Sequence, residues 1–394
     1  MRVKKRFWGL GTLGASALGV LVWASTGAGQ EIRSTTTEIS GSVVVYPKVV
    51  WDGTRDTIIQ LSNTGNNLAY VHCFYVNGAP VNPNQSPGLN NPPQWTVTDF
   101  ELVLTRQQPT MWAASAGRRV DHTSPFGTYG AGFDPGLIPP VPQGFTGELK
   151  CVQVDETGQP WPGNRLKGEA TIQRRNDGDV ATYNAIALPA NTQVLPGTDL
   201  ELNLTETNFG GTNFGGKYAA CPDTTILNHF ADGATQIALS SANSLGPVGL
   251  CAGNNCPVNT FLTVVPCSQD FESGRQTTVT LQFLTWDEFE ARLSGSFSVN
   301  CWLTAQLSQL SNAFTPSALG GSTTRHTRLR PVPGQGGVLA IAEELRRTSS
   351  SNVTAWAAYN LYTQGNRYDG ATTGENDDPL PAPNAVDVIS VPVE

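Results

Sequence analysis

The chain has 394 residues, of which 14% are charged, and its 24 basic and 32 acidic residues give it a formal net charge of −8. Nucleic acid is excluded as an expected partner, because its phosphates are bound mainly through clustered Lys and Arg. Gly (41 residues) and Pro (27) are abundant, and Thr, Asn and Ser separate the apolar runs. This composition is typical of extracellular all-β chains rather than of cytoplasmic helical ones.

Residues 1–28 have the pattern of a signal peptide. Four basic residues precede an uncharged apolar run over residues 7–23, and small residues at 26–28 offer a cleavage site before Gly29. An uncleaved anchor is the alternative, because the run approaches the length that spans a membrane. No later segment is apolar enough to span, so we predict a secreted, periplasmic or cell-surface protein without a membrane span after cleavage. The mature chain would carry 20 basic against 32 acidic residues, a net charge of −12.

Residues 29–195 are predicted to form a first β-sandwich domain. A β-branched run at residues 43–50 is interrupted by Pro47, which suits an edge strand or a bulge. Residues 78–94 and 117–144 have the composition of long loops. Strands are expected at residues 100–105, 110–115, 147–155, 166–173 and 181–188.

The stretch from residue 57 to residue 77 is predicted to be a β-hairpin on which this domain is built. Two alternating apolar runs flank a turn cluster of Asn, Thr and Gly at residues 63–67. Ile59 and Leu61 share a face of the first strand. In the second strand, the alternation places two sets of side chains on opposite faces, namely Val71, Cys73 and Tyr75 against Tyr70, His72 and Phe74.

Residues 196–380 are predicted to form a second β-sandwich domain, with the boundary near residue 195. Its expected elements are strands at residues 225–230 and 259–266, a second hairpin over residues 277–303, and strands at residues 325–329, 337–345 and 354–362. The order of elements is similar in the two halves, and residues 337–342 and 357–360 echo residues 147–152 and 181–186, which favours a duplication. We therefore predict an all-β fold of two tandem, antiparallel, Ig-like β-sandwich domains, with duplication as a further hypothesis.

Residues 381–394 are predicted to be a linker followed by an edge strand. Apolar and polar residues alternate after a Pro-rich segment. This strand could pair within its own sheet, or it could add to the open edge of a neighbouring molecule and support self-association.

Four stretches resemble a loosely defined group of uncharacterised secreted bacterial β-sandwich proteins. They are Tyr46-Pro47, Asp56-Thr57-Ile58-Ile59, Asn63-Thr64 and Phe145-Thr146-Gly147-Glu148-Leu149. The resemblance covers mainly residues 43–188 and its motifs are structural. It implies a secreted β-sandwich and carries no activity or functional residue to this chain.

All seven Cys lie in the mature chain, so disulfides are expected in an exported protein. Cys251 and Cys256 could close a small ring, and Cys73 and Cys151 both lie in strand patterns of the first half. Among Cys221, Cys267 and Cys301 we pair the first two. A zinc site made of the last five Cys is the alternative, but no close Cys-x-x-Cys pair or neighbouring His supports it. We expect no metal and no cofactor.

Four Trp residues of the first half lie in or near predicted loops, where an indole can stack on a sugar. They are Trp51, Trp95, Trp112 and Trp161, and the last three are our candidate binding residues for a surface polysaccharide. The alternative is that these aromatic side chains fill the ends of the sandwich. Asp-rich turns at residues 176–179 and 374–378 could offer oxygen atoms to Ca²⁺, but turn chemistry alone explains both.

The densest carboxylate cluster is Trp286-Asp287-Glu288-Phe289-Glu290, in which Asp287 and Glu290 could serve a glycoside hydrolase. We favour a solvated hairpin link instead. Four scattered His and the absence of a Gly-x-Ser-x-Gly elbow from the mature sequence give no catalytic pattern. We predict an exported, non-catalytic, cell-surface or extracellular structural or binding protein. The alternatives are a carbohydrate-binding or adhesive module and, last, a glycoside hydrolase.

Overall fold

The computed structural model describes residues 37–85, 90–118, 136–190, 218, 221–235, 257–267, 277–332, 337–347 and 353–366. These residues form three antiparallel β-sheets, which confirms the all-β prediction. The helical elements of the described part are α3 (Leu307–Leu310) and the 3-10 turns η2 (Asn312–Phe314) and η3 (Pro316–Leu319). No helix among these described residues has the length and apolar character that a membrane span requires.

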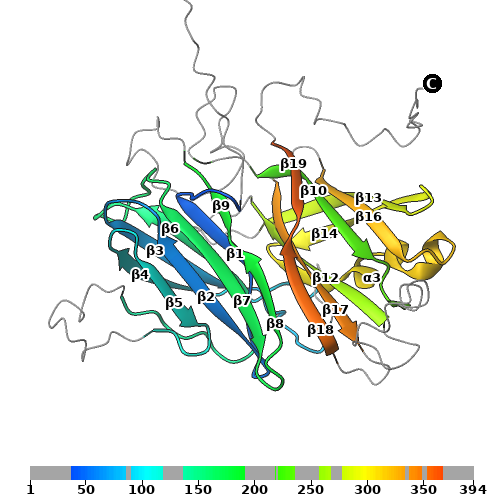
Figure 1. The fold of residues 1–394 in the computed structure, drawn as a ribbon, viewed down its shortest axis with the longest axis horizontal. Helices are drawn as coiled ribbons and strands as arrows, with labels where there is room; N and C mark the ends of the chain where they lie inside the picture. Colours follow the sequence, from blue (N-terminus) through cyan, green and yellow to red (C-terminus); the bar gives the residue numbers. More distant parts are fainter. Residues whose placement is uncertain are drawn as a thin grey trace, which may run out of the picture. The chain divides into compact units, whose positions relative to one another are not determined.

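The first half forms one sheet, which we call the first-half sheet (Figure 1). Its strand order is β4-β3-β6-β1-β2-β7-β8, while β5 pairs with β2 and β9 pairs with β1. Its strands are β1 (Val43–Trp51), β2 (Arg55–Asn63), β3 (Ala69–Asn77), β4 (Val97–Leu104), β5 (Pro109–Ala113), β6 (Phe145–Val154), β7 (Leu166–Arg174), β8 (Val180–Asn184) and β9 (Ile186–Leu188).

This sheet folds over on itself between β1 and β2, because these two strands are paired at a single position, Trp51 opposite Asp56. Side chains of the two layers meet in the sandwich core, which contains Val44 and Leu149 from one layer and Ile59 and Ile172 from the other. Each large apolar side chain buried there contributes about 1.5–3 kcal/mol relative to an exposed one. The first half is therefore a two-layered β-sandwich.

The predicted hairpin at residues 57–77 is wrong in its pairing, although both strands exist. Strand β2 pairs with β1, β5 and β7, whereas β3 pairs with β4 and β6. The intervening turn crosses between the layers because Asn63 Nδ2 donates to the carbonyls of Asn67 (2.7 Å) and Thr105 (2.8 Å). Thr64 N donates to Arg165 O at 2.7 Å in the other layer.

The predicted alternation within these strands is confirmed. Val71, Cys73 and Tyr75 lie in the sandwich core, together with Ile59 and Leu61 of β2. Alternation fixes which side chains share a face, but it does not fix which strand becomes the hydrogen-bonded neighbour.

Pro47 lies in a β-bulge, as predicted, since the pairing of β1 with β6 shifts register between Tyr46 and Val49. The backbone groups exposed by the bulge are bonded by side chains. Lys48 N donates to the hydroxyl of Tyr183 at 3.2 Å, and that hydroxyl donates to Lys48 O. Trp302 Nε1, from the second half, donates to Pro47 O at 2.8 Å. These backbone groups, which the bulge leaves without a partner on the neighbouring strand, thereby form hydrogen bonds inside the protein.

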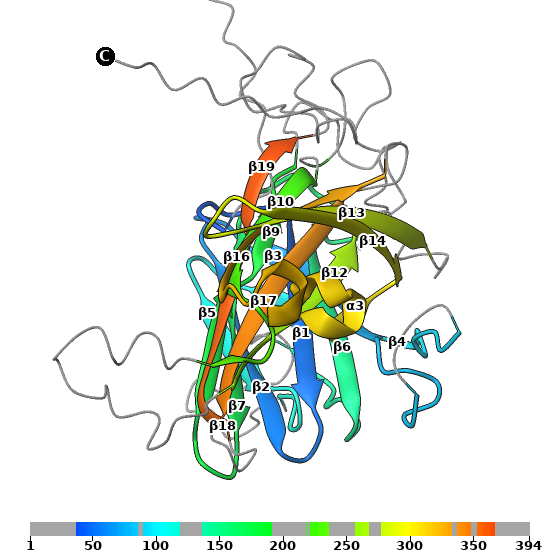
Figure 2. The same cartoon turned by 90° about the vertical axis from the view of Figure 1, so that its right-hand side faces the viewer.

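The second half forms two sheets. The outer sheet has the order β14-β13-β16-β10-β19, and the middle sheet has the order β11-β12-β17-β18 with β15 paired to β12 (Figure 2). Their strands are β10 (Pro222–Phe230), β11 (Ala234–Thr235), β12 (Pro257–Pro266), β13 (Thr278–Asp287), β14 (Arg292–Asn300), β15 (Leu303–Gln306), β16 (Thr324–Pro331), β17 (Val338–Arg347), β18 (Val353–Asn360) and β19 (Tyr362–Asn366).

The middle sheet is buried on both faces. One face packs on the outer sheet, where Leu262 and Ala340 meet Phe283 and Leu329. The opposite face packs on the first half through an interface core, in which Val265 and Leu339 meet first-half side chains such as Val43, Val45 and Ile186. The second half is thus a sandwich whose inner layer also packs on the first.

Two buried ion pairs accompany the interface core. Lys48 of β1 pairs with Glu343 of β17, and their side chains are 3% and 1% exposed. On β6, Lys150 Nζ lies 2.6 Å from Glu148 Oε1, again with both side chains buried. Residues 33–394 cluster as one compact unit. The predicted boundary near residue 195 lies outside the described residues.

The segments that suggested duplication do not occupy equivalent positions. Residues 337–342 and 357–360 lie on directly paired strands, with Ile341 opposite Asn360. Their first-half counterparts lie on β6 and β8, which are not neighbours in the sheet. Strands β13 and β14 form a true hairpin, unlike β2 and β3. Duplication and an Ig-like topology therefore remain predictions.

Two of the expected disulfides are present. Cys73–Cys151 joins facing residues of β3 and β6, and Cys221–Cys267 lies in the interface core. Cys301 is buried and carries a thiol. The pair Cys251 and Cys256 lies outside the described residues. Disulfides in the interior are typical of proteins from oxidising compartments.

Candidate binding face

The outward face of the outer sheet combines aromatic and arginine side chains, and we call it the arginine–aromatic face. Its defining residues are Trp286 of β13, His326, Arg328 and Arg330 of β16, and Tyr362 of β19. Strand alternation produces this face, because Val279, Leu281 and Phe283 point into the core between the sheets while the intervening residues are partly or fully exposed. Figure 2 shows β13, β14 and β16 on the side turned toward the viewer.

The register brings these side chains onto adjacent strands. Trp286 lies opposite His326, and Arg328 lies opposite Ile226, which in turn faces Tyr362. The rings of Trp286 and His326 are 5.7 Å apart between centroids, and Arg328 Cζ lies 5.8 Å from the centre of the Trp286 ring. Tyr362 is 71% exposed. The face therefore offers two separate aromatic surfaces with a guanidinium group beside one of them.

His326 contributes hydrogen bonding rather than charge at neutral pH. Its Nδ1 lies 2.8 Å from Asn228 Oδ1. Burial, followed by the positive charge of Arg328, lowers the pKa of His326 below its ordinary value of 6.5. The positive charge of the face thus comes from its arginines.

The outward positions of the outer sheet carry no carboxylate in the part of the chain that the structure describes. They hold Arg292, Arg328 and Arg330, and the remaining polar positions are Ser, Thr, Asn, Gln and His. Because the whole chain has a net charge of −8, this face is a basic area on an acidic protein.

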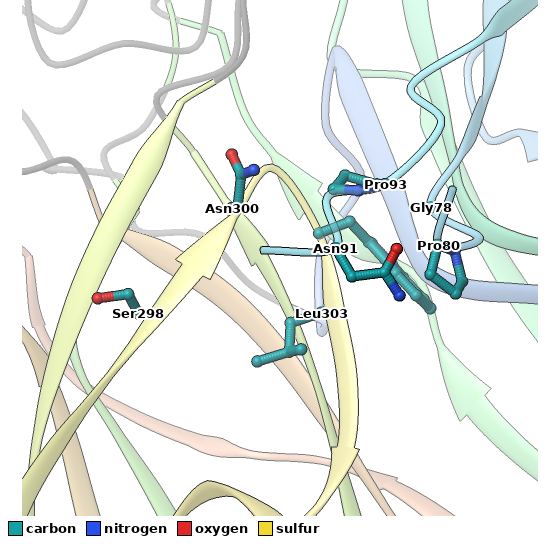
Figure 3. A pocket seen from close by; sticks show the side chains of 8 residues that line it. Gly78, Pro80, Asn91, Pro93, Ser298, Asn300 and Leu303 are labelled. Carbon is teal, nitrogen blue, oxygen red and sulfur yellow. The ribbon is translucent and has the colours of Figure 1, made fainter. Parts of the chain in front are cut away.

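A small pocket adjoins β14, the edge strand of the outer sheet (Figure 3). It encloses about 260 Å³ including its open mouth, and its lining comes from a first-half loop and from residues at the end of β14 and beyond. Gly78 is required there, because a Cβ at this position would lie 2.3 Å from the Trp302 ring. The lining residues are Gly78, Pro80, Asn91, Pro93, Ser298, Asn300, Trp302 and Leu303.

The three predicted Trp binding residues are not brought to one surface. Trp112 is 3% exposed in the sandwich core, and its Nε1 donates to Tyr75 OH at 2.6 Å, so its prediction as a sugar-stacking residue is wrong. Trp95 is partly buried against the interface core, on a different side of the first-half sheet. Trp161, in the link between β6 and β7, is 36% exposed.

The acidic cluster is a hairpin link, as favoured from the sequence. Asp287 Oδ1 accepts hydrogen bonds of 2.9 Å from the backbone N–H groups of Phe289 and Ala291, which close the turn between β13 and β14. Glu288 accepts from Thr323 N (3.2 Å) and from Thr324 N (3.1 Å). These carboxylates therefore hold the turn and its neighbouring loop together.

The proposed calcium turn at residues 176–179 is likewise held by its own side chains. Asp177 pairs with Arg174 and accepts a hydrogen bond of 3.2 Å from Asp179 N. The described residues include no cluster of three His, Cys, Asp or Glu side chains suited to a metal ion. The second turn, at residues 374–378, lies outside the described part.

Sequence reasoning missed the arginine–aromatic face, although a signal was present. In Thr324–Pro331, polar and cationic residues occupy positions 326, 328 and 330, while Thr327 and Leu329 are buried between them. The period-two pattern identifies one exposed face, but the contribution of Trp286 requires the pairing of β13 with β16.

No family model matches the chain, and no curated protein matches it. Among solved structures, it is similar to the lectin of Pleurotus ostreatus in its apo form, with 14% identity over 86% of this chain and 82% of the lectin chain. The TM-score is 0.17, so this likeness carries no argument about fold or ligand.

Proposed function

We propose that the protein is an exported, non-catalytic structural and binding protein of the cell surface or extracellular space, and that it binds polysaccharide through the arginine–aromatic face. The observation that carries this proposal is the placement of Trp286 beside His326 and Arg328 on the outward face of the outer sheet, with the exposed Tyr362 across the same sheet. Aromatic rings offer large, rigid contact area with few rotatable bonds.

The surroundings of these rings suit a hydroxyl-rich ligand. Ser294, Ser296 and Gln282 occupy exposed outward positions of the same sheet, and Asn228, whose Oδ1 lies 2.8 Å from His326 Nδ1, is exposed on β10. Hydroxyl and amide groups both donate and accept hydrogen bonds, as sugar hydroxyls do. The face also rests on a buried core, which holds the side chains in fixed relative positions.

A non-catalytic role is supported by how the titratable groups are used. Asp287 and Glu288 accept hydrogen bonds from backbone N–H groups around their own hairpin. His229 is buried, with Nε2 2.8 Å from Thr327 Oγ1 and Nδ1 2.7 Å from Phe230 O. These contacts engage groups that a hydrolase would direct at its substrate.

Retention of the purified mature protein on a panel of insoluble polysaccharides tests the proposal. We expect Trp286→Ala to lower the affinity for the polysaccharide about tenfold, which corresponds to about 1.4 kcal/mol of binding free energy. The fraction of protein retained should fall accordingly. Trp161→Ala is the matched control and should leave retention unchanged, and near-ultraviolet circular dichroism would verify that both variants are folded. Loss of retention in Trp161→Ala alone would move the site to the first half, and a wild-type protein retained on no polysaccharide would overturn the proposal.

A further inference from the structure

Arg328 and Arg330 lie two residues apart on β16 and therefore project from the same face of the outer sheet. Successive residues of a strand rise by about 3.3 Å, so the two Cα atoms are about 7 Å apart. Arg328 stands next to the Trp286 ring, and Arg330 lies opposite Gln282, whose side chain is exposed. Two guanidinium groups thus follow the strand beside an aromatic surface.

We propose that the arginine–aromatic face binds an anionic polysaccharide whose sugars carry carboxylate groups. This inference rests on the proposed function and names the class of ligand that the same face selects. A sugar ring can lie against Trp286 while its carboxylate meets Arg328, and a later carboxylate along the chain meets Arg330. The planar guanidinium fork pairs with a carboxylate through two parallel hydrogen bonds, which an uncharged sugar cannot form.

Charge complementarity is the evidence for this occupant. The outward positions of the described outer-sheet strands hold arginines without a carboxylate among them. Asp287 and Glu288 belong to the turn between β13 and β14 at one end of the face, where Glu288 Oε2 accepts a hydrogen bond of 2.7 Å from the hydroxyl of the outward Thr324. Both carboxylates also accept hydrogen bonds from backbone N–H groups of the turn or of residues 323 and 324. Attraction to the face must act at short range, because the protein as a whole is acidic.

Titration with oligogalacturonate and with its methyl ester tests the inference, since the ester has the same sugars without the charges. We expect the wild-type protein to bind the carboxylate form at least tenfold more tightly than the ester. The double variant Arg328→Gln/Arg330→Gln should lose this preference. Arg106→Gln, which removes the same kind of charge from an exposed turn of the first half, should keep it.

A second variant separates charge from geometry and guards against misfolding. Arg328→Lys/Arg330→Lys retains both charges but lacks the guanidinium fork, and we expect it to show an intermediate preference. Equal binding of both ligands by the wild-type protein would overturn the inference while leaving the proposed function in place. Binding of neither ligand in a protein retained on no other polysaccharide would overturn both. Tighter binding of single-stranded DNA than of oligogalacturonate would overturn the assigned occupant.

Discussion

The side chain of Asn360 is hydrogen-bonded to the backbone of Asn184 in both directions. Asn360 Nδ2 donates to Asn184 O at 2.7 Å, and Asn184 N donates to Asn360 Oδ1 at 2.9 Å. The primary amide thereby takes the place that a backbone peptide would have in an antiparallel ladder. It connects β8 of the first-half sheet with β18 of the middle sheet, at an edge where strand pairing between the two sheets is replaced by a side chain.

Replacing Asn360 should weaken this connection. Asn360→Ala removes two hydrogen bonds, each worth about 0.5–1.5 kcal/mol, so we expect the free energy of unfolding to fall by about 1–3 kcal/mol. Asn360→Asp keeps the acceptor but directs a carboxylate at the Asn184 carbonyl, so it should be at least as damaging. Urea unfolding monitored by Trp fluorescence measures both. Equal stability of the wild-type protein and Asn360→Ala would show that the pair of hydrogen bonds contributes nothing.

Removing one partner of the buried pair Lys48–Glu343 should lower the free energy of unfolding strongly. Replacing both partners together should lower it much less. Burial lowers the pKa of Lys48 despite the opposing charge of Glu343, so the ammonium group depends on its partner for stabilisation. Lys48→Met leaves an unpaired buried carboxylate, which costs about 3–5 kcal/mol. The double variant Lys48→Met/Glu343→Leu should recover most of that loss. Thermal unfolding of the three proteins checks the prediction, and a double variant no more stable than Lys48→Met would contradict it.

His229 should make the protein less stable in mild acid. Burial lowers the pKa of His229 from its ordinary 6.5 to about 4, so between these values the unfolded chain binds a proton that the folded chain does not. Stability therefore rises with pH across this window and is lost as pH falls from 6.5 toward 4. The full shift corresponds to about 3 kcal/mol.

The variant His229→Gln should flatten that part of the stability profile, measured by urea unfolding between pH 7 and pH 4. His72→Gln is the control, because His72 is partly exposed beside Asp99 and its replacement leaves His229 in place. If the slopes of wild-type protein and His229→Gln coincide across the window, His229 is not the source of the pH dependence.

The Cys301 thiol should be unreactive in the folded protein. Its residue is buried, and burial, with a further contribution from the negative charge of Glu148, raises the pKa of Cys301 to about 11. Since the thiolate is the reactive form, iodoacetamide should not modify Cys301 at pH 8 until the protein is unfolded in urea. Peptide mass spectrometry with the disulfides left intact measures this. Rapid modification of the native protein would contradict the buried placement.

Local patterns predicted strands well and their partners poorly. The strands at Val43–Trp51 and Phe145–Val154 follow from β-branched and alternating residues, and the bulge follows from Pro47. The pairing of β2 with β7 rather than with β3 depends on long-range hydrogen bonds made by Asn63 and Thr64, which no local pattern contains.

The candidate site was harder to predict than the fold for the same reason. Trp112 lies close to a predicted loop in the sequence. In the structure, its side chain is buried in the sandwich core among residues that are distant in the sequence. Lys48 and Glu343 are 295 residues apart in the chain and become partners through the packing of β1 on the middle sheet. In the sequence, Trp286 stands next to a cluster of carboxylates. Its neighbours in the arginine–aromatic face come instead from β16, which is distant in the sequence.

The most direct test of polysaccharide binding by the arginine–aromatic face is fluorine NMR of the mature protein labelled with 5-fluorotryptophan. Resonances would be assigned with Trp286→Phe, Trp161→Phe, Trp112→Phe and Trp95→Phe and followed during titration with oligogalacturonate. We predict that the Trp286 resonance shifts in a saturable manner while those of Trp161 and the buried Trp112 remain in place. A saturable shift of Trp161 or Trp95 with an unchanged Trp286 resonance would contradict the assignment of the binding face to the outer sheet.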